Sequence, residues 1–352
     1  MGVGRVQHDI PASRNAAAER TEPLVDAQPD RRRTGLDRYA FRRVLAAVCV
    51  GLALAGFIAA YVETGFHFEA EGGDGWNYLA AGERLNAGHQ LYALSPGDRN
   101  VVIVPPYWTV PLLAPPPVAV IWRPLALLGE PSMLVWGIAN MVATIATVLY
   151  LCWTNGLFGI AATAFLSAPL GLLALSGNVN GFVLAALVAA WSLRSNPVVV
   201  GGTLAFAIAM KLTPVLFLLW LIGHGRRPAA LATIAGLVVV LAISVVGAGF
   251  TAHLDWLQSV PGSRPSPQSL MSLTGLSSSA IFLLSAAAVA VVTRLGDERI
   301  TFTLAAILTA LASPAFYFQA LGLLLAAVAP WRDDLFAGRR LRGGTPTTPQ
   351  AT

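Results

Sequence analysis

The sequence predicts an all-α fold, a polytopic membrane helix bundle of about ten transmembrane segments, from three observations. Of its 352 residues, 55% are hydrophobic and only 12% are charged, whereas an ordinary soluble domain carries about 25% charged residues. Apolar runs of about 20 residues, the length that crosses about 30 Å of hydrocarbon, recur along most of the chain. Arginines gather in the tails and in short connections, where they orient a membrane protein. The net charge of +5 therefore does not indicate a nucleic-acid partner.

The first apolar run extends from about residue 44 to residue 62 and follows a polar, arginine-rich segment. The positive-inside rule places that segment in the cytoplasm, so we expect residues 1–43 to form a disordered cytoplasmic tail. The segment has no early apolar core, and we therefore expect no cleavable signal peptide. We expect residues 44–330 to form the transmembrane domain and residues 331–352 to form a second cytoplasmic tail.

Nine further apolar runs complete the expected ten. They lie near residues 108–128, 133–153, 157–175, 179–193, 198–222, 229–249, 276–293, 300–312 and 314–329. An even number of crossings returns the C-terminus to the cytoplasm. It also places the connections that carry Arg226, Arg294 and Arg332 there, as the positive-inside rule requires. The connections at about residues 63–109 and 250–275 then form two extracytoplasmic loop regions.

The run at residues 198–222 is interrupted by Lys211-Leu212-Thr213-Pro214, and proline breaks the hydrogen-bond ladder of a helix. Broken helices are tolerated at membrane depth where they face protein or a wet cavity. Two topologies follow. A single span buries Lys211 in the middle of the membrane. Two half-helices that turn near the outer surface bring Lys211 toward Asp74 and place Arg194 and Arg226 at the same end, and another segment then loses a crossing. We favour the broken element and leave the number of spans open.

Asp74 is the first candidate for chemistry, because it lies directly outside a membrane span in the segment Asp74-Gly75-Trp76-Asn77-Tyr78. A carboxylate beside apolar and aromatic groups can have a raised pKa and act as a general base toward a hydroxyl. The alternative is a solvated loop residue or the N-cap of a short amphipathic helix, which we expect in the membrane interface at about residues 75–86.

Lys211 is the second candidate, since a lysine at a helix centre costs about 2.5–3.5 kcal/mol on insertion scales. We expect it to pair with a carboxylate or to bind an anion such as a lipid-linked phosphate. Asn178 and Asn180 lie in a polar turn that is either a capped turn or part of a ligand site. Gln268, in a Pro/Ser-rich outer loop, is a candidate sugar contact. Arg123, near the end of an apolar run, is expected to snorkel.

No cofactor is expected. The sequence has no P-loop, dinucleotide fingerprint or nucleophile elbow. The outer histidines His67, His89 and His253 share no metal-ligand spacing, so we infer no metal requirement.

The order of these motifs resembles glycosyltransferase family 87, the DUF2029 group of integral-membrane, polyprenyl-phosphate-dependent mannosyltransferases with the GT-C fold. The resemblance covers roughly residues 44–330. It rests on Asp74-x-x-x-Tyr78, Gly88, Leu91-Tyr92, Pro115-Pro116, Pro124-Leu125-Ala126-Leu127-Leu128, Gly177-Asn178-Val179-Asn180, Lys211-Leu212-Thr213-Pro214 and Ser313-Pro314. Three positions depart from the family: Gln319 stands where a histidine is frequent, Asn178 stands where a glutamine is usual, and Ala114 stands where a tyrosine is common.

The resemblance implies a plasma-membrane enzyme with an extracytoplasmic active site. It implies transfer of mannose from a polyprenyl-phosphate donor to a glycolipid or cell-envelope glycan acceptor, with membrane lipids around the protein. Asp74 would be the catalytic base. The residues expected to contact the substrates are Tyr78, Tyr92, Asn178, Asn180, Lys211, Gln268 and Gln319, with Lys211 at the donor phosphate.

Two other functions remain open at this point. A transporter or flippase for a lipid-linked saccharide would use the same cavity and the same Lys211 contact, but it would not need Asp74 as a base. A catalytically degenerate partner subunit is suggested by Gln319, which can donate a hydrogen bond but cannot carry charge. The sequence does not specify an oligomeric state.

Overall fold

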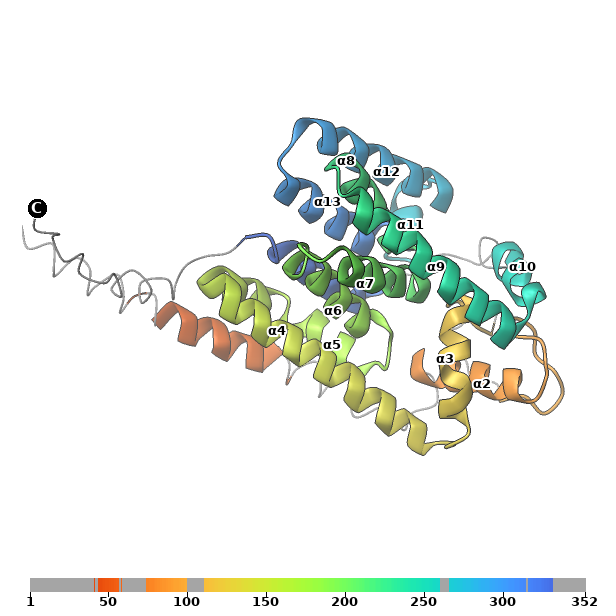
Figure 1. The fold of residues 1–352 in the computed structure, drawn as a ribbon. Helices are drawn as coiled ribbons and strands as arrows, with labels where there is room; N and C mark the ends of the chain where they lie inside the picture. The colour runs from red at the N-terminus through yellow and green to blue at the C-terminus, as the bar shows by residue number, and fades with distance from the viewer. Residues whose placement is uncertain are drawn as a thin grey trace, which may run out of the picture. The chain divides into compact units, whose positions relative to one another are not determined.

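Every regular element in the described part of the chain is a helix, as the sequence predicts (Figure 1). The computed structural model describes residues 41, 44–56, 58, 74–99, 111–259, 266–314 and 316–331. The two expected tails lie outside these residues, apart from Phe41 and Trp331.

An apolar helix at Val44–Gly56 precedes the labelled elements. These are α2 (Asp74–Asn86), α3 (Pro116–Ala126), α4 (Pro131–Phe165), α5 (Ser167–Leu175), α6 (Asn180–Ser192), α7 (Pro197–Met210), η1 (Thr213–Val215), α8 (Leu216–Gly223), α9 (Arg227–Ala248), α10 (Phe250–Ser259), α11 (Leu270–Thr274), α12 (Ser278–Leu295), α13 (Glu298–Leu311) and η2 (Phe318–Val328).

The element α4 folds back on itself at Gly156, where φ is 56° and ψ is −132°. The Sγ of Cys152 lies 3.5 Å from Oγ1 of Thr163, and Nδ2 of Asn140 donates to the carbonyl of Leu173 at 2.8 Å. Residues this far apart in sequence meet only if the chain reverses between them, because a straight helix rises 1.5 Å per residue. The two apolar runs expected on either side of Gly156 therefore form two antiparallel arms.

Hydrogen bonds join turns between helices in two separate clusters, one at each end of α7. At one end, Arg226 donates from Nη1 to the carbonyl of Arg194 at 2.8 Å and from Nη2 to Oε2 of Glu298 at 2.9 Å. We call this the arginine end. At the other, Asn178 contacts Asp74 and the Asn180 side chain contacts that of Lys211. We call this the aspartate end.

The interrupted run at residues 198–222 is two helices. Arg194 and Arg226 flank this run and meet at the arginine end, whereas Lys211, near its middle, lies at the aspartate end. The α7 helix therefore runs toward the aspartate end and α8 returns. Of the two topologies left open by the sequence, the structure has the broken one.

The expected span at residues 108–128 is wrong for the described part of that run. Its helix α3 has 11 residues, which at 1.5 Å per residue reach only about 16 Å and not the 30 Å of a hydrocarbon core. Trp122 of α3 is fully buried. Arg123, instead of merely snorkelling, donates to the carbonyl of Gly247 at 2.7 Å and to Oδ1 of Asn86 at 3.1 Å. This segment is thus packed between α2 and α9 at the aspartate end.

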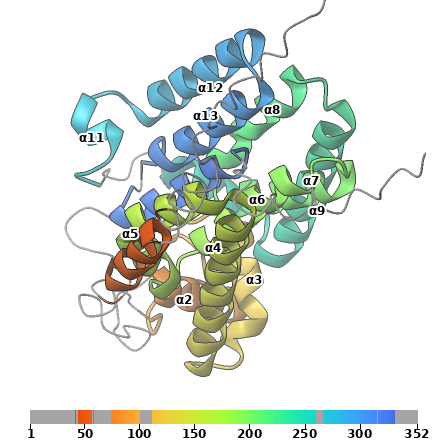
Figure 2. The same cartoon turned by 90° about the vertical axis from the view of Figure 1, so that its left-hand side faces the viewer.

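The helix expected at residues 75–86 is present as α2 (Asp74–Asn86), and it is packed against the rest of the protein. Nine of its residues are buried, including Trp76 and Tyr78. Both views show α2 beside α3 (Figures 1 and 2), and at Gly82 an added Cβ would approach the carbonyl oxygen of Trp122 to 2.7 Å. The missing side chain at Gly82 lets the two helices pack closely and holds the N-terminus of α2 in the bundle.

Three elements are long and apolar enough to cross a bilayer individually: α4 (Pro131–Phe165), whose longer arm precedes the fold at Gly156, α9 (Arg227–Ala248) and α12 (Ser278–Leu295). A fourth crossing follows if α5 and α6, which are bent by 117°, count as one broken span. Large parts of these helices are apolar and exposed, as expected for helices that face lipid. The chain is a membrane protein, and the expected number of ten spans is not shown by the described helices.

Candidate active site

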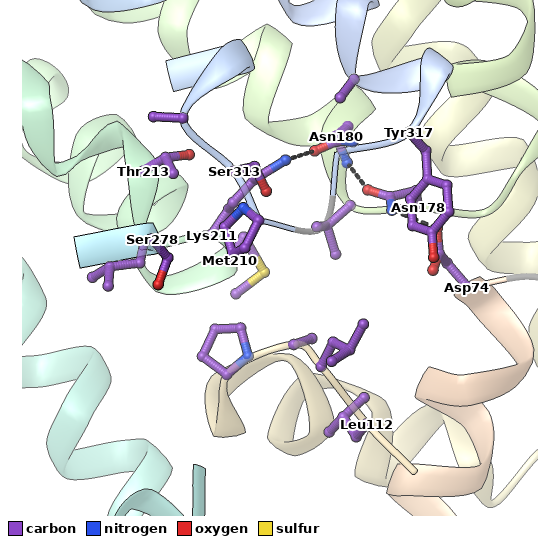
Figure 3. Close-up of a pocket in the computed structure, with 18 of the residues that line it drawn as sticks. Asp74, Leu112, Asn178, Asn180, Met210, Lys211, Thr213, Ser278, Ser313 and Tyr317 are labelled. Carbon is purple, nitrogen blue, oxygen red and sulfur yellow. Dashed lines mark hydrogen bonds between the residues drawn. The ribbon is translucent and has the colours of Figure 1, made fainter. Parts of the chain in front are cut away.

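A cavity of about 700 Å³ opens at the aspartate end (Figure 3). Elements far apart in sequence line it: the N-terminus of α2, the turn between α5 and α6, the turn between α7 and η1, the N-terminus of α12 and the segment after α13. Of the predicted site residues, the structure brings Asp74, Tyr78, Asn178, Asn180, Lys211 and Gln319 to this cavity.

Asp74 is the first residue of α2 and is only partly exposed. Its Oδ2 accepts a hydrogen bond of 2.5 Å from Nδ2 of Asn178 and a longer one of 3.4 Å from Nε2 of Gln319. Burial raises the pKa of the Asp74 carboxyl above its ordinary value, while the Asn178 bond, the charge of Lys211 and the Gln319 bond partly oppose that rise. The carboxylate is thereby held in place and made more basic.

Asn178 connects Asp74 to the next helix. Its Oδ1 accepts from the backbone N–H of Asn180 at 2.8 Å, which leaves its Nδ2 to donate to Asp74. Because the α6 terminus takes the oxygen, the orientation of the amide is determined. Asn178 is therefore both a cap of the turn and a contact of the candidate base, so the two roles left open by the sequence occur together.

The turn that carries Asn178 depends on two glycines. Gly177 has φ +67°, a conformation that side chains with a Cβ rarely adopt. An added Cβ there would lie 3.4 Å from the Cα of Gly75, so the turn and the start of α2 touch through their backbones. The indole N–H of Trp136 donates to the carbonyl of Gly177 at 2.7 Å. This contact anchors the turn to α4.

Lys211 ends α7 in an extended conformation, with φ −154° and ψ 128°. Its Nζ donates to Oδ1 of Asn180 at 3.3 Å. Lys211 is the only lysine in the sequence, and the other basic residues among the 23 are all arginines. A compact ammonium is strongly hydrated and costly to place among apolar helices. A single lysine in such a position therefore indicates a specific role, and the sequence alone shows it.

The remaining cavity wall is largely apolar. Met210, Trp256 and Phe282 contribute to it, together with Leu257 and Leu283. Leu257 is 60% exposed and Leu283 is 67% exposed, so the cavity reaches the outer apolar surface between α10 and α12. The site accordingly combines a short polar row with a wall and an opening suited to a hydrocarbon chain.

Two predicted substrate contacts lie elsewhere. Tyr92 is buried and donates from its hydroxyl to the carbonyl of Ala114 at 2.8 Å, so it anchors the segment before α3. Gln268 is exposed in the loop before α11. Neither side chain lines the described cavity. Three hydroxyl residues that were not predicted as contacts also line the cavity: Thr213, Ser278 and Ser313. Thr213 and Ser313 belong to motifs that the sequence shows, whereas a single serine such as Ser278 beside a helix start is too common to stand out.

The described histidines do not gather around a metal. His89 pairs with Asp98 through Nδ1 at 2.6 Å, and His253 contacts Oγ of Ser244 at 3.0 Å. Across the described ranges, no group of three or more histidine, cysteine, aspartate or glutamate residues is arranged to hold an ion. His67 lies outside the described residues.

The model of glycosyltransferase family 87 matches residues 113–340, which is more than half of the chain. The chain belongs to glycosyltransferase family 87. This family 87 protein is therefore a membrane glycosyltransferase. The matched residues include Asn178, Lys211 and Gln319, whereas Asp74 precedes them. The comparison with curated proteins and the comparison with solved structures each gave no match.

Proposed function

We propose that this family 87 enzyme transfers a sugar, mannose, from a polyprenyl-phosphate donor to a hydroxyl of a glycolipid or cell-envelope glycan. Asp74 acts as the general base and Lys211 binds the donor phosphate. The observation that carries the proposal is the row Asp74–Asn178–Asn180–Lys211, in which each neighbouring pair is hydrogen bonded. This row holds the base, Asp74, and the cation, Lys211, at two separate positions along one cavity (Figure 3).

The proposed reaction is a single displacement at the anomeric carbon. The acceptor oxygen forms the new bond to that carbon while its proton passes to Asp74. The bond from the anomeric carbon to the phosphate oxygen breaks, and polyprenyl phosphate leaves with one more negative charge than it had in the donor. Lys211 stabilises this developing charge. Attack opposite the leaving group inverts the anomeric configuration, so a β-linked donor gives an α-mannoside.

The surroundings of Asp74 suit a base. Burial raises the pKa of its carboxyl, and proton transfer is most efficient when the pKa of the base lies near the working pH. The two amide donors, Asn178 and Gln319, orient the carboxylate without supplying a proton that would compete for it. Gln319 therefore keeps a donor at the position where the family frequently has a histidine.

A lipid-linked donor fits the cavity better than a nucleotide sugar. Lys211 is the only Lys or Arg side chain among the described residues that line it, and the wall around Met210, Trp256 and Phe282 is apolar. A sugar phosphodiester carries one negative charge, which one ammonium matches. The exposed Leu257 and Leu283 at the opening would contact the polyprenyl chain within the bilayer.

We place the protein in the plasma membrane with both termini in the cytoplasm and the cavity on the extracytoplasmic side. The support is the arginine pattern: Arg194 and Arg226 meet at the end of the bundle away from Asp74. A cysteine that replaces Leu212 beside Lys211 should react with an impermeant thiol reagent from outside. Labelling from the cytoplasmic side alone would contradict this orientation.

The donor is tested with membranes that contain the protein and a lipid acceptor extract. Radiolabelled polyprenyl-phosphate mannose, polyprenyl-phosphate arabinose and a nucleotide-linked mannose are supplied in parallel, with membranes lacking the protein as the control. Transfer from polyprenyl-phosphate mannose alone is expected. Transfer from the arabinose donor would show that the sugar is arabinose and not mannose. Transfer from the nucleotide-linked donor would contradict the proposal of a lipid-linked donor. Movement of the labelled donor across the membrane without transfer would favour the transporter or flippase.

A further inference from the structure

The helix that follows Lys211 begins at the cavity. The turn η1 continues directly into α8, so that Thr213–Gly223 forms one apolar helical segment whose N-terminus faces the site. The residue before it, Leu212, makes no capping hydrogen bond with its side chain. Pro214 has no N–H and the N–H of Val215 donates to the carbonyl of Leu212 at 3.0 Å, so the attraction for an anion at this end comes from the helix dipole, which places partial positive charge there. This end of the segment favours an anion.

Thr213 adds an independent observation. The residue is only 7% exposed, and it lines the cavity. Its Oγ1 is buried and has no hydrogen-bond partner among the described residues. Leaving a buried hydroxyl unpaired is unfavourable, so such an atom calls for a functional explanation. Thr309 donates to the backbone carbonyl of Thr213 at 3.4 Å and so fixes the backbone without satisfying the hydroxyl.

Thr213 lies on the side of the cavity away from Asp74. Figure 3 shows Thr213, Ser313 and Lys211 around one part of it and Asp74 with Asn178 at another. Thr213 and Lys211 both line the same cavity, so an anion bound between them would take a hydroxyl donor from Thr213 and an ammonium from Lys211, with the general base further along the cavity. This is the separation that a displacement between an acceptor and a leaving group requires.

We propose that Thr213 donates a hydrogen bond to a phosphate oxygen of the prenyl-phosphate group, which binds between the Thr213 end of the helix and Lys211. The inference rests on the proposed lipid-phosphate donor and deepens it by assigning the leaving-group position to a named hydroxyl. The phosphate gains negative charge as it leaves, so the Thr213 bond strengthens during the reaction. It therefore stabilises the transition state as well as the bound donor.

The test compares wild type with Thr213→Val and Thr213→Ser, purified in detergent. Binding of farnesyl phosphate is measured directly, with farnesol and inorganic phosphate as the arms that separate the chain from the anion. Thr203→Val is the matched control, because Thr203 is a helical threonine whose Oγ1 bonds within α7 and which does not line the cavity. Melting temperatures without ligand check the fold.

We expect Thr213→Val to weaken farnesyl phosphate binding about tenfold or more, the range of a hydrogen bond to a charged group. Farnesol binding should not change, and inorganic phosphate should bind far more weakly than farnesyl phosphate. The ligand-free melting temperature should stay equal or rise, because the variant removes an unpaired buried hydroxyl. Thr213→Ser should restore binding, and Thr203→Val should bind as wild type does.

Three results would overturn the inference in different ways. Unchanged farnesyl phosphate affinity in Thr213→Val would remove Thr213 from the phosphate position and leave the proposed donor intact. If wild type binds farnesyl phosphate no better than farnesol, the cavity has no phosphate site, and both this inference and the proposed lipid-phosphate donor are contradicted. A lowered melting temperature in Thr213→Val that Thr213→Ser repairs, with affinity unchanged, would assign the hydroxyl a purely structural role.

Discussion

Nδ2 of Asn178 donates a hydrogen bond of 2.5 Å to Oδ2 of Asp74, across 104 residues of sequence. The Oδ1 of Asn178 accepts from the backbone N–H of Asn180, and the side-chain Oδ1 of Asn180 accepts from Nζ of Lys211. A substitution at Asn178 should thus alter the hydrogen bonding of the candidate base Asp74 on one side and the position of the cation Lys211 on the other. This linkage makes the base testable through its neighbour without altering the carboxylate.

The first prediction concerns the pH dependence of transfer. Asp74 must be ionised to act as a base, so activity falls as pH drops through its pKa. Burial raises that pKa and the Asn178 bond opposes the rise, so Asn178→Leu should raise the pKa further and move the acidic limb of the pH–rate profile to higher pH. Transfer rates measured in membranes over a series of buffers provide the check.

The control for this profile is Gln258→Leu, which removes an exposed amide from α10 outside the cavity. It should leave the acidic limb where it is in wild type. An acidic limb that stays in place in Asn178→Leu, with the melting temperature preserved, would show that the Asn178 bond does not act on the titrating group.

The second prediction concerns the turn at Gly177. Its φ of +67° disfavours any residue with a Cβ, at a cost of about 1–2 kcal/mol. An added Cβ would lie 3.4 Å from the Cα of Gly75, which is an ordinary contact, so the cost comes from the backbone conformation. Gly177→Ala should therefore lower the free energy of unfolding and separate Asn178 from Asp74, so that the transfer rate falls. Thermal unfolding and the transfer assay measure the two effects.

Gly202→Ala is the matched control for the turn. Gly202 lies within α7, and an added Cβ would meet nothing within 4 Å. Alanine favours a helix over glycine by up to about 1 kcal/mol, so this variant should keep or gain stability and keep full activity. Equal behaviour of the two variants would refute a special role for the Gly177 turn.

The third prediction uses the fact that Lys211 is the only lysine. An amine-specific reagent can modify only this side chain and the N-terminal amine, and the two are separated by peptide mapping. If Lys211 contacts the donor phosphate, farnesyl phosphate should protect Lys211 from modification and leave the N-terminus unprotected. Farnesol is the control without charge. Equal modification of Lys211 with and without farnesyl phosphate would exclude the contact.

The fourth prediction concerns the arginine end, which should contribute to stability and not to catalysis. Arg226 donates to Glu298 and to the carbonyl of Arg194, and its side chain is 26% exposed. Arg226→Met should lower the free energy of unfolding by about 1–3 kcal/mol, the range of a lost charged hydrogen bond. Its affinity for farnesyl phosphate should equal that of wild type. Reduced affinity without reduced stability would mean that this end is coupled to the cavity.

Several features of the site were predictable because they break a local rule. Asn178 and Asn180 are polar residues between apolar runs, and Lys211 with Pro214 interrupts what would otherwise be a span. Such breaks are unfavourable in a membrane unless the polar groups find partners. In the described part of the chain, Lys211 donates to the amide oxygen of Asn180, whereas the sequence predicts a carboxylate or an anion as its partner.

Other features depend on packing that no local rule contains. The run containing Trp122 is as apolar as a span, but its helix is short and lies between α2 and α9. The family resemblance predicts Tyr92 as a substrate contact and the outer-loop position predicts Gln268, but neither side chain lines the cavity. The unpaired hydroxyl of Thr213 is visible only after the helices are packed.

The most direct test of the account is transfer of labelled mannose from polyprenyl-phosphate mannose by Asp74→Asn. The variant keeps the shape of the side chain but removes the base. Transfer should fall by about 10²- to 10⁴-fold, while farnesyl phosphate binding persists and Asp255→Asn, a carboxylate of α10 outside the cavity, keeps the wild-type rate. Transfer by Asp74→Asn at the wild-type rate would contradict the central claim that Asp74 is the catalytic base.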